Sequence, residues 1–298
     1  MALGYVMGFG LFTIVALLLA LRLGERVLSP VHAATRHLAG DGKAGSNLGG
    51  DDLADDDKAR RLLSVGQTLA VFLVAGSAVK NCLRGETLLA DVAWVSSFAL
   101  AGLLLVAVSG GIGVRMLFHS RLSQEIERGN TAAGLAAGAH YVATGIITSQ
   151  ALAGHSLFEL GLSMGFFVLA QVTLHLFVML FRALTTYDDA EQIQGENVAA
   201  ALSYGGITIA IAIVIARALD GDFEGLFVSL RGYGAVLLFL FALYPIRQLL
   251  VQSLLLGAPL SLRGGRLDEG IAAERNEGMA ALEAVTYLST ALAISQLL

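Results

Sequence analysis

The sequence predicts an all-α polytopic membrane protein with eight transmembrane helices, arranged as four repeated helical hairpins. The first observation is composition: of 298 residues, 56% are hydrophobic and only 14% are charged, and the mean hydropathy is +0.72. Soluble domains carry about 25% charged residues. The second is that the apolar residues form runs of about 20, the length that a helix needs to cross a bilayer. The third is a short motif that recurs before several of these runs.

Eight apolar runs are visible along the chain. They span residues 3–23, 62–82, 92–117, 131–153, 157–184, 198–219, 233–256 and 278–298. Each is continuously apolar, whereas the strands of a membrane β-barrel alternate over about 10 residues, so a barrel is a poor alternative. The first run has neither a basic segment before it nor a small-residue cleavage site after it. We therefore expect a retained helix and not a signal peptide.

The basic residues predict an orientation. All 19 Lys and Arg residues except Lys80, Arg84, Arg217 and Arg231 lie in or beside the connections after the first, third, fifth and seventh runs. Connections rich in Lys and Arg stay in the cytoplasm. Both termini are then expected outside the cytoplasm.

Residues 24–61 form the one sizeable polar connection. This stretch is rich in Gly and Asp and poor in apolar residues, so we expect a solvated and largely disordered cytoplasmic loop. Its segment Gly40–Ser46 contains Gly, Lys and Ser, but the spacing fails the phosphate-binding pattern and no strand precedes it. Nucleotide binding and a cation site at the aspartates are therefore disfavoured, and no basic surface suggests nucleic acid.

A motif recurs where three connections enter the next helix. It stands at Glu125–Ala133, Gln192–Ala200 and Ala273–Ala281, with a fainter copy at Ala59–Leu69. Asn130 and Asn197 are expected to cap the following helices through their side-chain oxygens. In the last copy, Glu277 is placed at the Asn position. Helix capping is the simpler interpretation, and a functional surface formed by Glu125, Gly129 and their equivalents is the alternative.

Small residues at a spacing of four predict close helix packing in a membrane. They occur at Gly134 and Gly138, Gly161 and Gly165, and Gly4 and Gly8. Together with the motif, they divide the chain into four hairpins of one orientation, at 1–85, 86–155, 156–222 and 223–298. The sequence does not decide whether these hairpins close into a ring.

The motif Glu-Ile-x-x-Gly-Asn-x-Ala-Ala resembles that of the YjfL-like membrane proteins, the domain of unknown function 350. The match is best at Glu125–Ala133 and partial at Gln192–Ala200, where Glu196 replaces the Gly. The family's tandem two-helix units extend the resemblance to most of the chain. It implies a bacterial cytoplasmic-membrane protein, with family members accompanying peptide-ligase-like and envelope-stress proteins, and it supplies no catalytic residue.

Ionisable side chains inside a membrane are functional candidates. If residues 131–153 and 157–184 form a hairpin, His140 and His175 lie at equal depth, and so do Thr144 and Gln171. The arrangement predicts either a proton or cation site or interhelical hydrogen bonding. Two histidines alone make a poor metal site, so no metal and no cofactor are predicted.

Glu283 is the second candidate, about 8 Å inside the last helix at 1.5 Å per residue. Arg247 and Arg182 are its expected partners. An ion pair that locks helices is the simpler role, and a gating carboxylate is the alternative. Tyr244, Gln248 and Gln252 are expected to extend a polar stripe on the seventh helix.

Two functions stay open at this stage. One is a conduit or transporter for a small cation, a proton or a polyamine-like solute. The other is a membrane scaffold whose motif turns bind a cytoplasmic protein partner. No enzyme is predicted, because the patterns of hydrolases, metalloproteases and redox enzymes are absent from the sequence. The lipid bilayer is the expected environment, and the small-residue faces are compatible with a homo-oligomer.

Overall fold

The computed structural model describes residues 4, 6–17, 19, 50–85, 87–118, 122–221 and 223–298. Every regular element in these ranges is a helix. The elements are α2 (Gly50–Cys82), α3 (Leu88–Phe118), α4 (Leu122–Glu127), α5 (Thr131–Ala151), α6 (Leu157–Arg182), α7 (Asp189–Gln194), α8 (Val198–Ala218), α9 (Leu226–Leu237), α10 (Leu240–Arg247), the π-helix η1 (Gln248–Leu255), α11 (Arg266–Ala272) and α12 (Glu277–Leu297).

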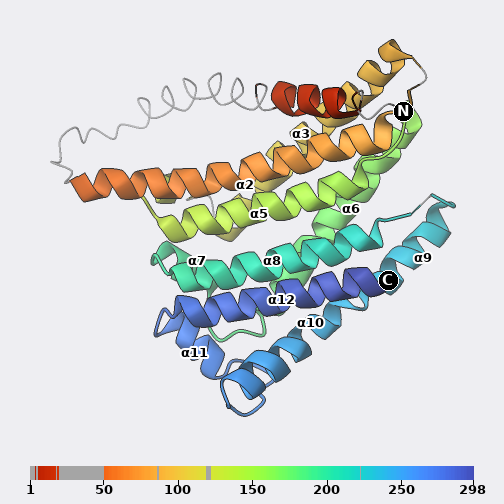
Figure 1. The fold of residues 1–298 in the computed structure, drawn as a ribbon. Coiled ribbons are helices and arrows are strands. Elements are labelled where there is room, and N and C mark those ends of the chain that lie inside the picture. Colours follow the sequence, from red (N-terminus) through yellow and green to blue (C-terminus); the bar gives the residue numbers. More distant parts are fainter. Residues whose placement is uncertain are drawn as a thin grey trace.

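Four long helices form a row. Helices α2, α5, α8 and α12 lie side by side in this order and run in one direction (Figure 1). The end at which they begin, where α7 and α11 also lie, is called the motif end here. Helices α2 and α12 stand at opposite edges (Figure 1), so the four motif-bearing helices form an open row and not a ring.

The remaining long helices make a second layer over this row. Helix α3 packs against α2 and α5, α6 against α5 and α8, and the α9–α10 segment against α8 and α12. Each of these helices therefore covers the groove between two neighbours of the row. The interior of the protein lies between the two layers.

Small residues set the spacing and the register of the row. A Cβ atom at Gly66 of α2 would overlap the backbone of Gly138 of α5. Gly205 of α8 faces Ala139 of α5, and Gly206 faces Ala284 of α12 in turn. Backbones can approach this closely only where side chains are small. The prediction from Gly134 and Gly138 is thus confirmed, because both lie against the backbone of α2.

The other predicted glycine pairs are not helix contacts. A Cβ atom added at Gly161, Gly165, Gly4 or Gly8 would meet nothing within 4 Å. The prediction that these four glycines bring helices close together is therefore wrong for the described part of the chain. A spacing of four defines one face of a helix, but it does not reveal whether that face meets another helix.

Six helices in the described residues are long and apolar enough to cross a membrane. They are Lys58–Cys82, Leu88–Met116, Leu157–Arg182, Val198–Ala218, Leu226–Leu255 and Glu277–Leu297. The predicted count of eight is not confirmed, since the N-terminal apolar helix covers only Val6–Leu17 and α5 is less apolar. Thirteen of the 21 residues of α5 are buried, so protein rather than lipid surrounds much of this helix.

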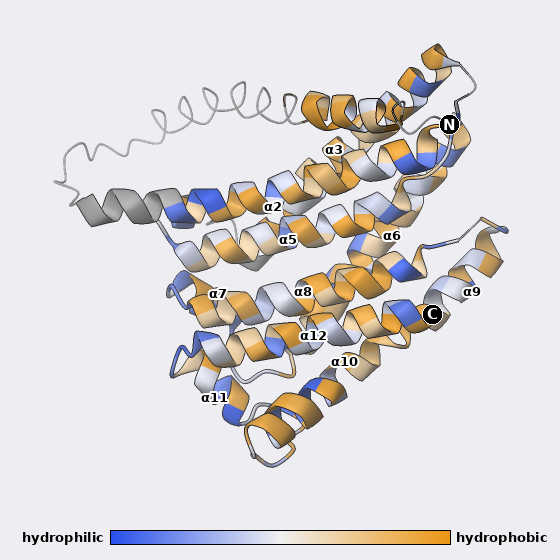
Figure 2. Cartoon of the chain, viewed as in Figure 1, coloured by the Kyte–Doolittle hydropathy of each residue, from blue (hydrophilic) through white to orange (hydrophobic). Residues whose placement is uncertain are grey.

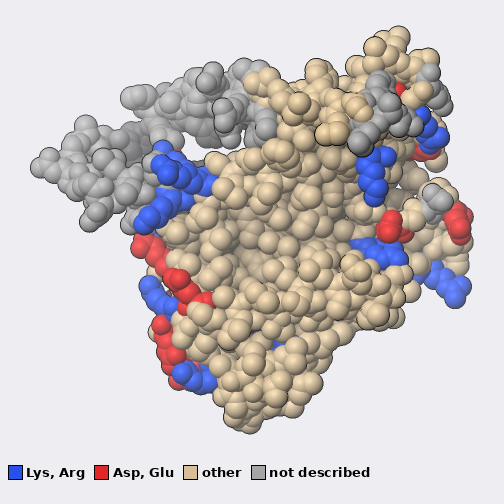
Figure 3. All heavy atoms as spheres, in the orientation of Figure 1, with Lys and Arg blue, Asp and Glu red and all other residues tan. Residues whose placement is uncertain are grey.

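Charged side chains gather at the two ends of the molecule. On the face shown in Figure 3 an almost uncharged belt separates them, and it coincides with the apolar middle of the helices (Figure 2). This distribution is the one expected of a protein whose middle lies in hydrocarbon.

Helix α2 begins earlier than the sequence suggested. The predicted loop 24–61 was expected to last until the apolar run at residue 62, but residues 50–61 are helical. Acidic residues are favourable in the first turns of a helix because they face its positive end. Residues 20–49 lie outside the described part of the chain.

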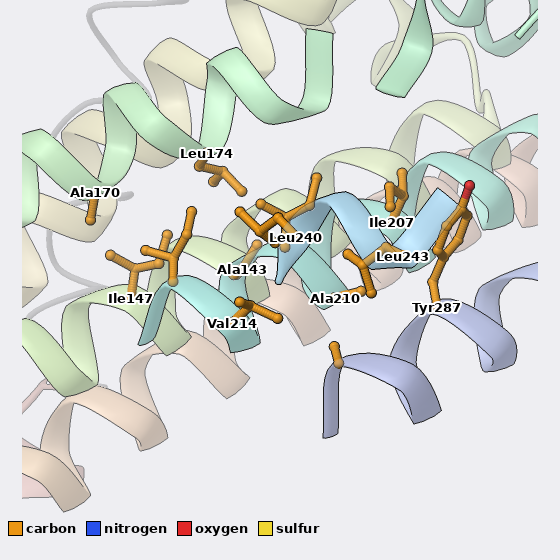
Figure 4. Close-up of a cluster of buried hydrophobic side chains, with 14 of the residues drawn as sticks. Ala143, Ile147, Ala170, Leu174, Ile207, Ala210, Val214, Leu240, Leu243 and Tyr287 are labelled. Carbon is orange, nitrogen blue, oxygen red and sulfur yellow. The ribbon is translucent and has the colours of Figure 1, made fainter. Parts of the chain in front are cut away.

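An apolar cluster fills the middle of the interior (Figure 4). Its side chains come from both layers, among them Ile147 of α5, Leu174 of α6, Val214 of α8 and Leu240 of α10. In a bilayer such packing gains little from removal of water, and close van der Waals contact is the main source of stability. The cluster separates the polar groups at the two ends of the protein.

The Gly138→Ala substitution tests the close contact between α2 and α5. The added Cβ atom would lie 2.6 Å from the carbonyl oxygen of Leu62, so the backbones must separate. We expect the free energy of unfolding to fall by about 1–3 kcal/mol, measured by thermal unfolding of the purified protein in detergent. The matched control, Gly161→Ala, meets no neighbour and should leave stability unchanged or raise it by up to ~1 kcal/mol. Equal destabilisation by both would refute the contact.

Candidate functional site

The asparagines of the motif cap the helices of the row. The side-chain oxygens of Asn130, Asn197 and Asn276 accept from the N–H three residues further on, at the starts of α5, α8 and α12. Capping by Asn130 and Asn197 is as predicted. In the last copy the Asn position is Asn276 and not Glu277, which is the first residue of α12.

The last turn is one residue longer than the other two. The N–H of Asn130 donates to Glu125 O and that of Asn197 to Gln192 O, five residues back in each case, whereas the N–H of Asn276 donates to Gly270 O, six back. The Ala pair of the motif follows Asn130 and Asn197 by two and three residues but follows Asn276 by four and five, so a spacing counted back from Ala280 and Ala281 misses Asn276.

Two of these asparagines also bond the next motif turn along the row. The amide of Asn130 donates to Ile193 O at 2.8 Å, and that of Asn197 donates to Ile271 O at 2.9 Å. Both asparagines are buried. Asn276, at the end of the row, is exposed. One residue type thus caps its own helix and bonds the following turn.

The position of Gly129 needs a left-handed backbone. Gly129 has φ 83°, and its equivalents Glu196 and Arg275 have φ 64° and 51°. Only glycine adopts this conformation without steric strain. The substitution by Glu196 that weakens the family motif in the second copy is therefore accommodated at a cost in backbone strain.

A cavity of about 280 Å³ opens at the motif end and reaches His140 and His175. The imidazole rings lie 5.4 Å apart between their centroids, so the predicted equal depth of the two residues is observed. Nδ1 of His140 lies 3.3 Å from the hydroxyl of Tyr204, and Nδ1 of His175 lies 2.7 Å from Gln171 O. Gly113 of α3 leaves the space for the His140 ring, because a Cβ atom there would overlap it.

Several buried polar atoms of His140, Thr144, Gln171 and His175, the predicted polar group, make no hydrogen bond. Nε2 of both histidines, Oγ1 of Thr144 and both side-chain polar atoms of Gln171 are buried without a hydrogen-bond partner in the protein. Buried polar atoms are almost always bonded, and exceptions often mark a site for a ligand or water. Dry interhelical hydrogen bonding, the simpler prediction, accounts poorly for five such atoms in one group.

An ion pair borders the mouth of this cavity. Arg182 at the end of α6 pairs with Asp189 of α7, and its guanidinium lies 5.2 Å from the centre of the Tyr187 ring. Burial raises the pKa of Tyr187, so its hydroxyl stays neutral and bonds to Ser203. The sequence analysis paired Arg182 with Glu283. In the structure its partner is Asp189, which α7 brings beside the end of α6.

A second ionic group lies between α10, α11 and α12. Arg247 is fully buried and donates to Glu283 at 2.7 Å and to Asp268 at 2.6 Å. The pairing of Glu283 with Arg247 is as predicted, while Asp268 was missed. Asp268 also accepts from the N–H of Thr186 at 2.9 Å, so this group fastens the connection between α6 and α7 to α10, α11 and α12.

The polar stripe of the seventh run lies beside Arg247. Tyr244, Gln248 and Gln252 are all buried, and the amide of Gln248 donates to Tyr244 at 2.7 Å. Pro245 interrupts the backbone bonding of α10, and the helix continues as η1. A π-helical stretch widens the turn and often occurs at functional sites.

A larger cleft of about 680 Å³ opens at the opposite end. Charged residues of both signs line it, including Lys80, Arg84 and Arg217 together with Glu159 and Asp220. Arg217 forms an ion pair with Asp220 at 3.2 Å. Tyr233 and Ser163 also line it. Along α5 and α6, residues of the apolar cluster such as Ile147 and Ala170 stand between the residues of this cleft and the histidines.

Comparison with known proteins agrees with this architecture. The model of the family described as "Domain of Unknown Function (DUF350)" matches residues 51–152 and again residues 155–298. The chain belongs to this family. The two matches are tandem copies of the DUF350 domain, and each covers two helices of the row.

A curated relative carries the same kind of description. The chain is 31% identical over 106 residues to a "UPF0719 transmembrane protein" of Aquifex aeolicus (strain VF5), a match that covers 35% of this chain and 40% of that protein. Less than half of the relative's length is therefore matched. No solved structure matches this DUF350 chain.

Exchanging residues at the left-handed position tests the strain in the motif turns. Gly129→Ala should lower the free energy of unfolding by about 1 kcal/mol, and Glu196→Gly should raise it by a similar amount. Chemical denaturation in mixed micelles measures both. A shift of the same sign in the two variants would contradict the shared backbone conformation.

Removal of Arg247 tests the second ionic group. Arg247→Met leaves Glu283 and Asp268 buried without their cation and should cost about 3–5 kcal/mol of stability. The control Arg231→Met removes an exposed arginine and should change stability by less than about 0.5 kcal/mol. Thermal unfolding distinguishes the two, and a near-neutral Arg247→Met would show that the ion pairs do not hold α10, α11 and α12 together.

Proposed function

We propose that this DUF350 protein is a conduit or transporter for a small cation, a proton or a polyamine-like solute. The observation that carries the proposal is the motif-end cavity, which ends at two imidazoles with unpaired nitrogen atoms. A dry structural contact would satisfy such atoms, because an unpaired buried polar group costs about 1–3 kcal/mol. A hydrated or solute-bound site satisfies them from the cavity.

The second cleft supports the same proposal. Solute carriers need access from either side of the membrane and a barrier between the two openings. Here one opening leads to His140 and His175, the other leads to Tyr233 and Ser163, and apolar side chains lie between them. Gln171 lies one helical turn from His175 and provides the next polar group towards the barrier.

The proposal includes a topology. The N-terminal helix and α5 are counted as crossings, which gives eight spans in four hairpins of one orientation. The motif end faces the cytoplasm of a bacterial cell, and both termini lie on the other side of its cytoplasmic membrane. The concentration of Lys and Arg in the connections at the motif end supports this orientation.

A scaffold that binds a cytoplasmic protein is the second candidate. Its support is the exposure of the motif turns, where the side chains of Arg128 and Glu196 are 48% and 60% exposed. However, Arg128 also bonds to Glu125 and to the carbonyl of Gln194. Its contacts thus serve internal packing, which makes the scaffold the weaker proposal.

Flux through reconstituted protein tests the first candidate. Liposomes containing the purified chain should move H⁺, K⁺ or a polyamine, and His140→Ala/His175→Ala should abolish this movement because the solute path loses both imidazoles. The control is Leu176→Ala, because Leu176 follows His175 on α6 but is exposed and lines neither opening, and this variant should retain most of the flux.

The other outcomes are equally informative. Flux that survives in the double variant would keep the conduit and remove the histidines from its path. No flux from correctly folded protein would favour the scaffold, which then predicts copurification of a soluble partner that is lost when Arg128 and Glu196 are substituted.

A further inference from the structure

Two thioethers join the histidines in the motif-end cavity. Met116 of α3 and Met179 of α6 line the same 280 Å³ space as His140 and His175. Met179 stands four residues after His175 in α6, which places both on one face of that helix. Three helices, α3, α5 and α6, therefore bring two imidazoles and two methionines to one small volume.

The carboxylates near this cavity are engaged elsewhere. Asp189 pairs with Arg182, and the side chain of Asp188 caps α7 by accepting from Glu191 N. In the described part of the chain, no three His, Cys, Asp or Glu side chains are placed to share a metal ion. The ligands that hard or borderline divalent ions prefer are thus not assembled here.

The remaining ligand set is a soft one. Thioethers select Cu(I), and imidazole is compatible with copper as well. The two Nε2 atoms are buried and unpaired, so they are free to coordinate an ion. Methionine has three rotatable bonds and adapts its sulfur position to a ligand, which is consistent with Met116 and Met179 being 55% and 57% exposed at the edge of the cavity.

We propose that this cavity binds a soft monovalent metal ion, Cu(I) or Ag(I), between His140 and His175, with Met116 and Met179 completing the coordination. The inference rests on the proposed function as a small-cation conduit and names the class of cation. The exposed thioethers receive the ion at the cavity mouth and pass it to the buried imidazoles. No proton or electron is exchanged in this step, because both ligand types bind as neutral donors.

Titration with Ag⁺ tests this proposal, since Ag⁺ needs no reductant. Purified protein in nanodiscs should bind one Ag⁺ in calorimetry. The protein has a single cysteine, Cys82, which is buried, and every sample carries Cys82→Ala so that the thiol does not compete. His140→Ala/His175→Ala should abolish binding, and Met116→Leu/Met179→Leu should weaken it by at least about tenfold. Leucine keeps the apolar volume of methionine.

The control variant is Met164→Leu. Met164 lies on the same helix as Met179 but does not line the cavity, so Ag⁺ affinity should not change. X-ray absorption of the Ag⁺-loaded protein should detect both nitrogen and sulfur ligands, with the sulfur lost in Met116→Leu/Met179→Leu. Absence of saturable binding, binding that is unaffected by the histidine and methionine variants, or a site without sulfur would each overturn the inference.

This measurement is independent of flux. Proton or potassium flux without Ag⁺ binding would refute the soft-metal site and leave the conduit standing. Ag⁺ binding with the expected ligands but no flux of any cation, including Ag⁺, would support the metal site and refute the conduit.

Discussion

The close approach of neighbouring backbones in the α2–α5–α8–α12 row is the constraint on which the rest of the structure depends. Lipid tails are as apolar as the helices, so association requires close van der Waals packing and polar contacts between helices. Ala139 of α5 meets Gly205 of α8, and Gly206 of α8 meets Ala284 of α12. In both contacts, a residue nine positions after its capping asparagine meets one eight positions after the next capping asparagine. Val285 of α12 is equivalent to Ala139 and Gly206, and it is 59% exposed. The larger residue therefore stands on the face of α12 where the row ends.

This row explains where the polar groups are. The capping asparagines Asn130 and Asn197 each bond the following motif turn, which holds the starts of α5, α8 and α12 at one level. The second layer then encloses the space between the helices, and the histidines, Arg182 and Arg247 all lie within it, towards the motif end. Charged and titratable groups can be kept inside a membrane protein because they face the protein interior and not the lipid. The resulting interior is polar near the motif end and apolar at its centre.

Much of the candidate site followed from simple helix geometry. A hairpin between the fourth and fifth runs placed His140 beside His175, because helices of constant rise that turn back on themselves match residues at equal depth. The pair Arg247–Glu283 followed from the need to neutralise a buried charge. Asp189, Asp268, Tyr204 and Met116 were not identified, since they come from turns or helices whose placement depends on packing between hairpins. Asn276 was missed because the Ala pair of the motif lies two residues further from the asparagine in the last copy.

The sequence by itself determined that the protein is helical, that it belongs in a membrane and that its turns repeat, because hydrophobic length, charge placement and capping residues act locally along the chain. Only the tertiary structure decided that the motif-bearing helices form an open row, that Gly134 and Gly138 pack whereas Gly161 and Gly165 do not, and that α5 is enclosed by protein. Those features depend on which helix faces meet. Which faces meet depends on many close contacts between segments that are distant in the sequence, and a local sequence pattern does not contain this information.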